Sequence, residues 1–463
     1  MAAAEAPMAS ALVCSGCGWR AGPDTAEPFR CQEQQPGDDV DHVLVRELSG
    51  PSPDWPSLPR GSEAGSLQPF VHFRRFLHSW RTAISAGMSD EEWCDIVLRI
   101  DEVLAQVDGS GFRFTPYGRA PELSNALGFS SQGGVFIKNE TGNVSGSHKA
   151  RHLMGLAIWF AVTERVAYGE ARLEAALAIA SCGNAALAAA VVARAVQRPL
   201  QVFVPEDADA SVMDKLQFLE AQVLTCERRE GDPPGDPCLH RFHEAVAGGA
   251  LPFSCQGSEN GLVVEGGSTL AWELICQHQA AGRAALDRLF VQVGGGALAS
   301  SLGQGFTDAQ RAGGLLRSPS VFAVQAVGAA PFYRAWRRFV GEGDEGAGSQ
   351  GLAAADGLKA AARHRSQYMW PLETQPASAA GGILDDETYD WLGVLRAVTE
   401  SGGQAVVASE EHIARAHRLA HEHTTIDVCI TGAAGLAGLL ACLEAGAVAP
   451  DESVALLFTG HKR

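Results

Sequence analysis

Lysine is scarce in this chain. Of the 463 residues, 36 are Lys or Arg, and the lysines are Lys138, Lys149, Lys215, Lys359 and Lys462. Asp and Glu together number 54, which gives a formal net charge of -18. A nucleic-acid partner needs a basic face, and an anionic membrane surface attracts runs of Lys or Arg. We therefore expect neither partner. A chain that uses lysine so rarely also invites a chemical explanation for the lysine in "VSGSHKAR".

Aromatic residues are few, and the sequence shows neither a long apolar run nor a secretion signal. Aromatics make up 7% of the chain against 46% for all hydrophobic residues, so the core is expected to be mainly aliphatic. The longest apolar stretch, "AALAAAVVA" at 185–193, ends at Arg194 and is far shorter than a membrane span. The first residues have neither the basic nor the long apolar region of a signal peptide. The 11 cysteines are odd in number and scattered, which suits a reducing compartment, and we expect a cytoplasmic protein.

Three cysteines near the start resemble the beginning of a zinc ribbon. "CSGCGWRAGPDTAEPFRC" contains Cys14, Cys17 and Cys31. A closed structural zinc site needs four ligands, and the position three after Cys31 is Gln34. His42 is the nearest substitute but is too far along the sequence for a tight knuckle. We predict that residues 1–48 form a degenerate ribbon that is metal-free or weakly metallated; a bound zinc ion is the alternative.

Short apolar runs alternate with helical patterns from about residue 70 onward. The runs are continuous rather than alternating in polarity, as in strands that are buried on both faces of a sheet. Because helical patterns separate them, they predict an α/β fold with mostly parallel sheets flanked by helices. The predicted strands are 134–140, 176–181, 200–205, 222–226, 288–293, 320–325, 404–409 and 453–458.

Two of the loops at strand exits carry candidate functional side chains. In α/β folds, ligands bind at the carboxyl ends of the strands. The loop after the strand at 134–140 carries Lys149, just ahead of a helical pattern at 152–166. The loop "SCGN" carries Ser181 and Asn184, whose polar groups suit a carboxylate; an ordinary helix N-cap is the alternative.

A third strand exit is rich in glycine. "VQVGGGALASS" places three glycines ahead of a helix, where free amides form a phosphate cradle. It matches neither a Walker loop nor a dinucleotide fingerprint, and a turn for close packing is the alternative. Lysine amines form Schiff bases with carbonyls, and pyridoxal phosphate brings a phosphate that needs such a cradle. A cradle, a carboxylate pocket and a lysine in a turn therefore point together to this cofactor.

Four motifs resemble the fold-type II pyridoxal phosphate enzymes, and within them the threonine synthase branch. The run from Lys138 to Arg151 is similar to the family's "K-D-E-x-x-N-P-T-G-S-F-K-D-R", and "SCGN" to its "S-T-G-N". "GGSTLAWEL" at 266–274 is similar to "GQ-x-T-x-A-x-E-I", and the final "TGHKR" to "TGHGLK". The matches follow the family's order over residues 138–463. The wider group includes the tryptophan synthase β-chain and threonine dehydratase.

The resemblance implies an organisation and a set of site residues. It implies a large cofactor-binding domain at 49–157 and 255–463, a small α/β domain at 158–254, and a homodimer. Lys149 is expected to hold pyridoxal phosphate and to act as base on the substrate Cα proton. The other implied cofactor contacts are Asn184 to the phenolic oxygen, the amides of Gly294, Gly295, Gly296 and Ala297 to the phosphate, and Thr459 to the pyridine nitrogen. Ser181, Cys182 and Gly183 are expected to bind the substrate, and Thr431 either faces the substrate or caps a helix.

Departures from the family pattern bear on the reaction. His148 replaces the usual phenylalanine, Ala150 an aspartate and Cys182 a threonine or serine, while "GGGAL" resembles the dehydratases more than the "GNGGN" of threonine synthases. A hydroxyl at Thr459 cannot hold the ring nitrogen protonated by charge, which favours elimination over transamination. We predict a carbon–oxygen lyase or synthase that acts on the β- or γ-carbon of a small amino acid, threonine synthase-like.

Other functions stay open from the sequence. A serine/threonine ammonia-lyase that yields a 2-oxo acid, or a catalytically divergent homologue, are the alternatives. Threonine synthase must bind a second phosphate, for which Arg151 and Lys138 are candidates; Arg151 is equally a candidate structural ion-pair partner. A nucleotide enzyme with the same cradle is disfavoured by the missing fingerprints. A non-catalytic interaction protein is disfavoured because Lys149, Asn184 and Thr459 are all present.

Overall fold

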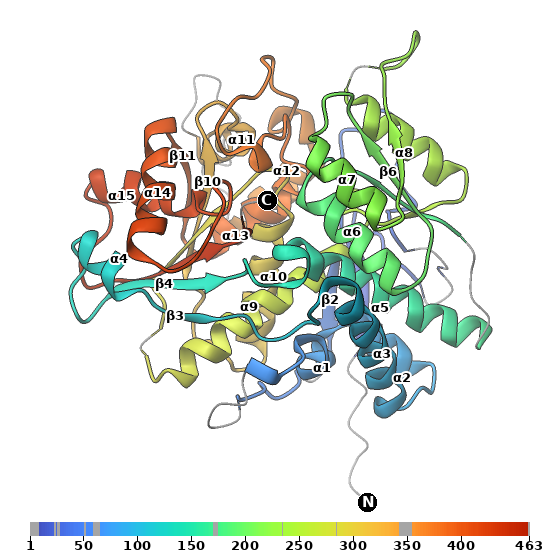
Figure 1. Cartoon of the computed structure of the whole chain (residues 1–463), viewed down its shortest axis with the longest axis horizontal. Helices are drawn as coiled ribbons and strands as arrows, with labels where there is room; N and C mark the ends of the chain where they lie inside the picture. Colours follow the sequence, from blue (N-terminus) through green and yellow to red (C-terminus); the bar gives the residue numbers. More distant parts are fainter. Residues whose placement is uncertain are drawn as a thin grey trace, which may run out of the picture.

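The chain folds into two lobes, each built on a sheet with helices around it (Figure 1). The computed structural model describes residues 9–461 except 23–24, 26–27, 51, 59–64, 170–174, 234, 284 and 342–353. Residues 1–8 of the predicted ribbon segment thus lie outside the described residues, as do short pieces of the other predicted domains. The architecture confirms the predicted α/β class with mostly parallel sheets.

The large sheet has the strand order β11-β10-β9-β12-β4-β3. Its strands are β3 (Tyr117–Arg119), β4 (Gly134–Asn139), β9 (Arg288–Gln292), β10 (Ser320–Ala326), β11 (Gln404–Ala408) and β12 (Ser453–Phe458). All neighbours are parallel except β3 and β4. The exits of β4, β9, β10 and β12 therefore open at one edge of the sheet, and β12 runs centrally between β9 and β4.

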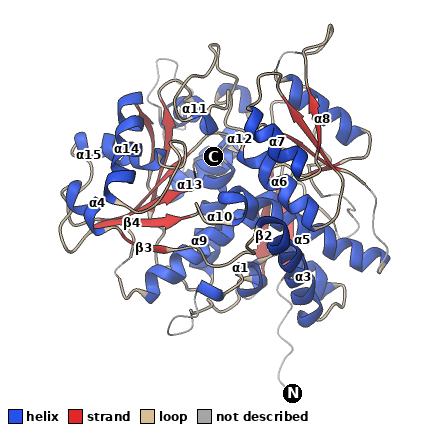
Figure 2. Cartoon of the chain, in the orientation of Figure 1, coloured by secondary structure: helices blue, strands red, loops and turns tan. Residues whose placement is uncertain are grey.

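Helices cover both faces of the large sheet (Figure 2). On one face lie α9 (Val263–Ala280), α10 (Ala297–Arg311), α11 (Pro331–Val340) and α13 (Trp391–Glu400), and on the other α4 (Pro121–Ala126), α14 (Glu410–His423) and α15 (Ala434–Glu444). Each set closes its own apolar cluster against the sheet. Burial on both faces explains why these strands read as continuous apolar runs.

The small lobe contains a fully parallel sheet, order β7-β6-β5-β8. Its strands are β5 (Leu177–Ala180), β6 (Leu200–Val204), β7 (Gln222–Thr225) and β8 (Leu251–Pro252), and its helices are α6 (Asn184–Ala195), α7 (Ala210–Phe218) and α8 (Pro237–Ala247). Leu177 and Ile179 face α6, while Ala178 and Phe203 pack against α8. All eight predicted strands are present, and no strand end is shifted by more than one residue. The domain boundaries themselves stay predictions.

The remaining elements lie beside the two sheets. They are the antiparallel ribbon β1 (Ala9–Cys14) and β2 (Leu44–Ser49), and the helices α1 (Pro69–His72), α2 (His78–Ser85), α3 (Asp90–Asp108), α5 (Lys149–Tyr168) and α12 (Ala354–Arg363). Helix α5 packs against both α9 and α6, and so joins the two lobes. Among the described residues, no helix combines the length and the apolar character needed to cross a membrane.

Candidate active site

Lys149 is the first residue of α5, three residues earlier than the helical pattern in the sequence begins. The loop between β4 and α5 is fixed by the exit of β12, because the backbone N–H of His148 donates to the Thr459 carbonyl over 3.1 Å. Gly146 has a φ of 67°, and a Cβ there would collide with the ring of His461. The loop that aims Lys149 thus needs both the left-handed glycine and the strand exit beside it.

A cavity of about 860 Å³ lies between the two lobes and reaches Lys149. Of the predicted site residues, the cavity wall includes Lys149, Ser181, Cys182, Gly183, Gly295, Gly296 and Ala297. These residues come from three separate strand exits, as predicted from the sequence. Burial raises the pKa of Cys182, so this thiol stays neutral beside the cavity.

Three predicted residues lie behind the cavity wall instead. Gly294 packs so tightly that a Cβ would collide with Asp385 and Ile383. Asn184 begins α6, and its amide nitrogen lies 3.3 Å from where a Cβ of Gly460 would stand. Thr459 is 4% exposed, and its hydroxyl accepts a 2.6 Å hydrogen bond from Gln292. Asn184, which follows β5, therefore lies beside Gly460 at the exit of β12, next to the lysine loop.

Helix α10 begins at the glycine-rich loop with an uncapped end. Gly296 stands at its N-cap position with a φ of 96°, and no side chain caps the helix. The first N–H groups of a helix point outward and favour anions. The Asp385 carboxylate lies at this helix start, and its hydrogen bond to the Gly295 amide partly offsets the effect of burial. The Asp385 carboxylate, a hydrogen-bond acceptor, thus already occupies part of the predicted phosphate cradle.

The segment before α13 supplies cavity residues that no sequence motif indicated. Asp385, Asp386, Tyr389 and Asp390 all line the cavity. Burial raises the pKa of Asp385 to about 6, although the nearby Lys149 opposes this shift. Burial also raises the pKa of Asp390 to about 7, while its hydrogen bond from the Gly257 amide, 3.1 Å long, lowers it. Only the acidic run "DDETYD" marked this segment in the sequence.

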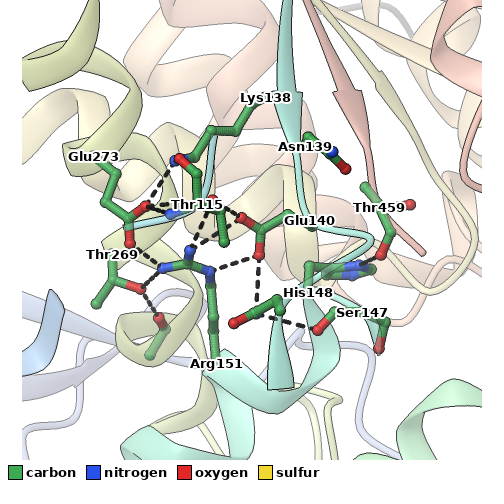
Figure 3. A network of polar contacts seen from close by, with 12 residues as sticks. Thr115, Lys138, Asn139, Glu140, Ser147, His148, Arg151, Thr269, Glu273 and Thr459 are labelled. Atoms are coloured by element: carbon green, nitrogen blue, oxygen red, sulfur yellow. Dashed lines mark hydrogen bonds and ion pairs between the residues drawn. The ribbon is translucent and has the colours of Figure 1, made fainter. Parts of the chain in front are cut away.

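Arg151 and Lys138 are held in a buried ion-pair network (Figure 3). Arg151 lies 2.7 Å from Glu140 and 2.6 Å from Glu273, and Lys138 lies 2.7 Å from Glu273. All four side chains are fully buried, and Thr115 completes the network. Although burial alone would raise it, the two cations hold the pKa of Glu273 below its usual value. Arg151 and Lys138 therefore act as structural partners and are not free to bind a substrate phosphate.

Thr431 and His148 also have defined surroundings. Thr431 does not cap a helix, because the N-cap position of α15 belongs to Ala433. Its hydroxyl instead accepts a 3.1 Å hydrogen bond from the amide of Gly382, a cavity residue. Burial, with the positive charge of Lys149, lowers the pKa of His148 well below 6.5, so the ring is neutral.

Comparison with known proteins places the site in a family context. Residues 110–460 match the family model described as "Pyridoxal-phosphate dependent enzyme". The threonine synthase of Methanocaldococcus jannaschii is 25% identical over 348 residues, covering 75% of this chain and 74% of that protein. The threonine synthase of Mycobacterium leprae is 26% identical over 347 residues, covering 75% and 81%.

Solved structures of similar fold are more distant in sequence. The processed form of threonine deaminase isoform 2 from Solanum lycopersicum has a TM-score of 0.56 at 16% identity, covering 81% of this chain and 91% of that chain. Maize serine racemase has a TM-score of 0.57 at 17% identity, covering 79% and 93%. Diaminopropionate ammonia lyase from Escherichia coli has a TM-score of 0.57 at 16% identity, covering 80% and 89%. These likenesses confirm the fold predicted from the sequence.

Proposed function

Because the chain belongs to the family of pyridoxal-phosphate dependent enzymes, we propose that it is a lyase that eliminates a substituent from a small amino acid bound beside Lys149. Bound in the cavity, pyridoxal phosphate would supply the electron sink that makes the substrate Cα proton labile. Lys149 is placed to hold the cofactor and to carry that proton, since it lies at the cavity wall on a fixed helix start.

The residues present fit this cofactor. The uncapped start of α10 offers the amides of Gly296 and Ala297 to a phosphate, and a phosphate would compete with Asp385 for the amide of Gly295. The Thr459 hydroxyl already accepts from Gln292, which leaves its own proton free to donate to a ring nitrogen. Asn184 lies beside Gly460, the residue after Thr459, and its side-chain amide could donate to the phenolic oxygen of the cofactor. These groups have the polarity that the cofactor needs, and they support the proposal.

The Thr459–Gln292 pair is the observation that favours elimination over transamination. A carboxylate at this position would keep the pyridine nitrogen protonated by charge, and the ring would then withdraw electrons strongly. Here the neutral hydroxyl is fixed by a neutral amide at 2.6 Å, and both side chains are buried. A weaker electron sink favours loss of a β-substituent over transamination.

The charge of the cavity favours an ammonia-lyase over a threonine synthase. Among the residues that the structure describes, its wall carries four carboxylates, Asp236, Asp385, Asp386 and Asp390, and two cations, Lys149 and Arg228. Arg228 donates to the Pro233 carbonyl over 3.1 Å and to that of Gly235. A substrate phosphate needs dedicated cationic or amide donors, and this wall offers few beyond those of the cofactor cradle. Serine or threonine, which carry one carboxylate and a neutral side chain, fit better.

Threonine synthase activity is the second candidate. It is supported by the two threonine synthases that are 25–26% identical over about three quarters of this chain.

We also propose that the enzyme is a cytoplasmic homodimer. The scattered free cysteines support a reducing compartment, and the dimer is proposed by analogy with the family.

One assay separates the candidates. The holoenzyme is given L-serine, L-threonine and O-phosphohomoserine in turn, and 2-oxo acid, phosphate and threonine are measured. Formation of 2-oxo acid from serine or threonine supports the ammonia-lyase, and phosphate released together with threonine supports the synthase. No turnover of any of the three by cofactor-loaded protein would refute both. Lys149→Ala must abolish turnover, whereas Lys215→Ala, at an exposed position of α7, must not.

A further inference from the structure

Four metal-ligand side chains meet in the N-terminal ribbon. Cys14, Cys17, Cys31 and His42 each offer a ligand atom, and these atoms all lie within 4.8 Å of one another. We propose that they bind one zinc ion, which fastens the ribbon to the catalytic body of the enzyme. The sequence-based expectation of a metal-free ribbon rested on the lack of a fourth ligand, and that premise is wrong.

Strand pairing brings His42 to the cysteines. Strands β1 and β2 are antiparallel, with Cys14 opposite Leu44. Beyond that pair, the Ser15 amide donates to the Val43 carbonyl over 2.9 Å, so the chain just before β2 runs beside the Cys14 turn. A separation of 28 residues in sequence thus becomes a 3.4 Å separation between Cys14 Sγ and His42 Nδ1.

The spacing of the ligand atoms suits tetrahedral zinc. Zn–S bonds of about 2.3 Å and Zn–N bonds of about 2.0 Å, at tetrahedral angles, separate two sulfurs by about 3.7 Å and a sulfur from a nitrogen by about 3.5 Å. Cys17 Sγ and Cys31 Sγ lie 3.5 Å apart, and Cys14 Sγ and His42 Nδ1 lie 3.4 Å apart. The site needs only slight expansion to admit the ion.

The surroundings of the ligands match those of a metal centre. His42 Nε2 lies 3.0 Å from Asp38 Oδ2, which holds the proton on Nε2 and leaves the Nδ1 lone pair facing the sulfurs. Backbone amides also point at sulfur, from Cys17 to Cys14 Sγ and from Trp19 to Cys17 Sγ, each over 3.4 Å. A thiol is a weak acceptor, so these donors are best used by metal-bound thiolates.

The ligand set selects the metal. Three thiolates and one imidazole in a tetrahedral arrangement favour zinc over magnesium or calcium, which prefer oxygen ligands. Cys14, Cys31 and His42 are almost fully buried while Cys17 is exposed, so the ion has an entry path on the Cys17 side. Four protein ligands leave no open position, which indicates a structural rather than a catalytic centre.

The chain beside His42 connects the ribbon to the active-site segment. The Asp41 amide donates to the Ala362 carbonyl over 2.8 Å, and the Asp41 carboxylate lies 3.6 Å from Arg365. Arg365 also pairs with Glu387, which lies between the cavity residues Asp386 and Tyr389. A zinc ion that fixes His42 would therefore also hold Asp41 in place, and with it the ion pairs through Arg365 to Glu387 beside the cavity.

Metal analysis of untagged holoenzyme tests the proposal. We expect one zinc ion per chain, loss of that zinc in Cys17→Ser, and full retention in Cys94→Ser, a thiol of α3 outside the cluster. Replacement of zinc by Co²⁺ should give the intense visible bands of a tetrahedral site and a thiolate charge-transfer band. Absence of zinc, or zinc that survives in Cys17→Ser, would overturn the proposal, as would a Cys17–Cys31 disulfide found by mass mapping in zinc-free protein.

A milder variant guards against simple misfolding. Asp38→Asn keeps the fold but weakens the hydrogen bond that orients His42, and we expect zinc affinity to fall by about 10- to 100-fold in chelator competition. Asp54→Asn, at another exposed position near the N-terminus, should leave the affinity unchanged. Cofactor absorbance shows that each variant is folded, and equal zinc affinity in Asp38→Asn and the wild type would contradict the assigned role of Asp38.

Discussion

Arg151 Nη1 lies 2.6 Å from Glu273 Oε1, so the helix that begins with Lys149 is tied to α9 by an ion pair with no exposed surface. Lys138 lies on the other oxygen of the same carboxylate, 2.7 Å away. Glu273 thus contacts both buried cations, and Glu140 supplies the second negative charge that balances them.

Glu273→Gln should destabilise the protein strongly. It removes a carboxylate that faces two buried cations and leaves them short of one charge, which typically costs about 3–5 kcal/mol. The free energy of unfolding from urea denaturation measures the effect. Glu102→Gln, exposed in the middle of α3, is the matched control and should change stability by less than about 0.5 kcal/mol. A small effect in Glu273→Gln would mean that the network contributes little.

Lys149 should be the residue that carries the cofactor. Borohydride reduction of the holoenzyme followed by peptide mapping should label the peptide that contains Lys149, because this is the lysine on the cavity wall. Lys138 is engaged in the buried network and Lys215 is exposed on α7, so neither should be labelled. A label on either of them would exclude the assignment of Lys149.

Thr459→Asp should change the reaction rather than only slow it. A carboxylate at this position would favour a protonated ring nitrogen, so the cofactor absorbance should shift and side transamination should appear. Thr459→Ser keeps the hydroxyl next to Gln292 and should retain both the wild-type spectrum and the product ratio. If Thr459→Asp has the same spectrum and products as the wild type, the hydroxyl does not tune the ring.

Asp390→Asn should stabilise the protein in a pH-dependent way. Burial raises the pKa of Asp390 to about 7, against an ordinary value near 3.9, so the folded protein holds this proton where the unfolded chain has lost it. The contribution of Asp390 to the free energy of unfolding therefore falls as pH rises from about 4 to 7. Above pH 7 the buried carboxylate destabilises the folded protein by on the order of 1–4 kcal/mol. The gain from Asp390→Asn should be large at pH 8 and small at pH 4.5. Urea denaturation at both pH values, with the exposed Asp95→Asn as control, checks this; an equal gain at both would contradict it.

Much of the fold was predictable because burial on both faces leaves a clear pattern. Every predicted strand from 134 to 458 exists, since continuous apolar runs arise directly from helices on both sides of a parallel sheet. The short strands β3 and β8 were not predicted, because three or two residues are too few to show a pattern. The predicted start of the helix at Lys149 was three residues too late, because its first turn contains polar residues; one of them, Arg151, is buried in the ion-pair network.

The site was predictable only where a local motif marks it. The lysine turn, "SCGN" and the glycine loop each lie at a strand exit, and the structure brings them to one cavity. Asp385 and Asp390 were missed because their position depends on how a long connection folds back over Gly294 and Gly296. His42 was not predicted as a ligand because it lies 28 residues after Cys14 in the sequence. The pairing of β1 with β2 nevertheless brings the two side chains together.

The central position of β12 in the large sheet has a consequence for biosynthesis. Residues 453–458 pair with both β9 and β4, and all six are buried, so the large sheet stays split until the ribosome has passed them. The small sheet, whose strands all lie between 177 and 252, is complete much earlier and can fold while translation continues. A nascent chain therefore carries Lys149 without Thr459 or Gly460 beside it until β12 has been synthesised, and it gains the cofactor site only then.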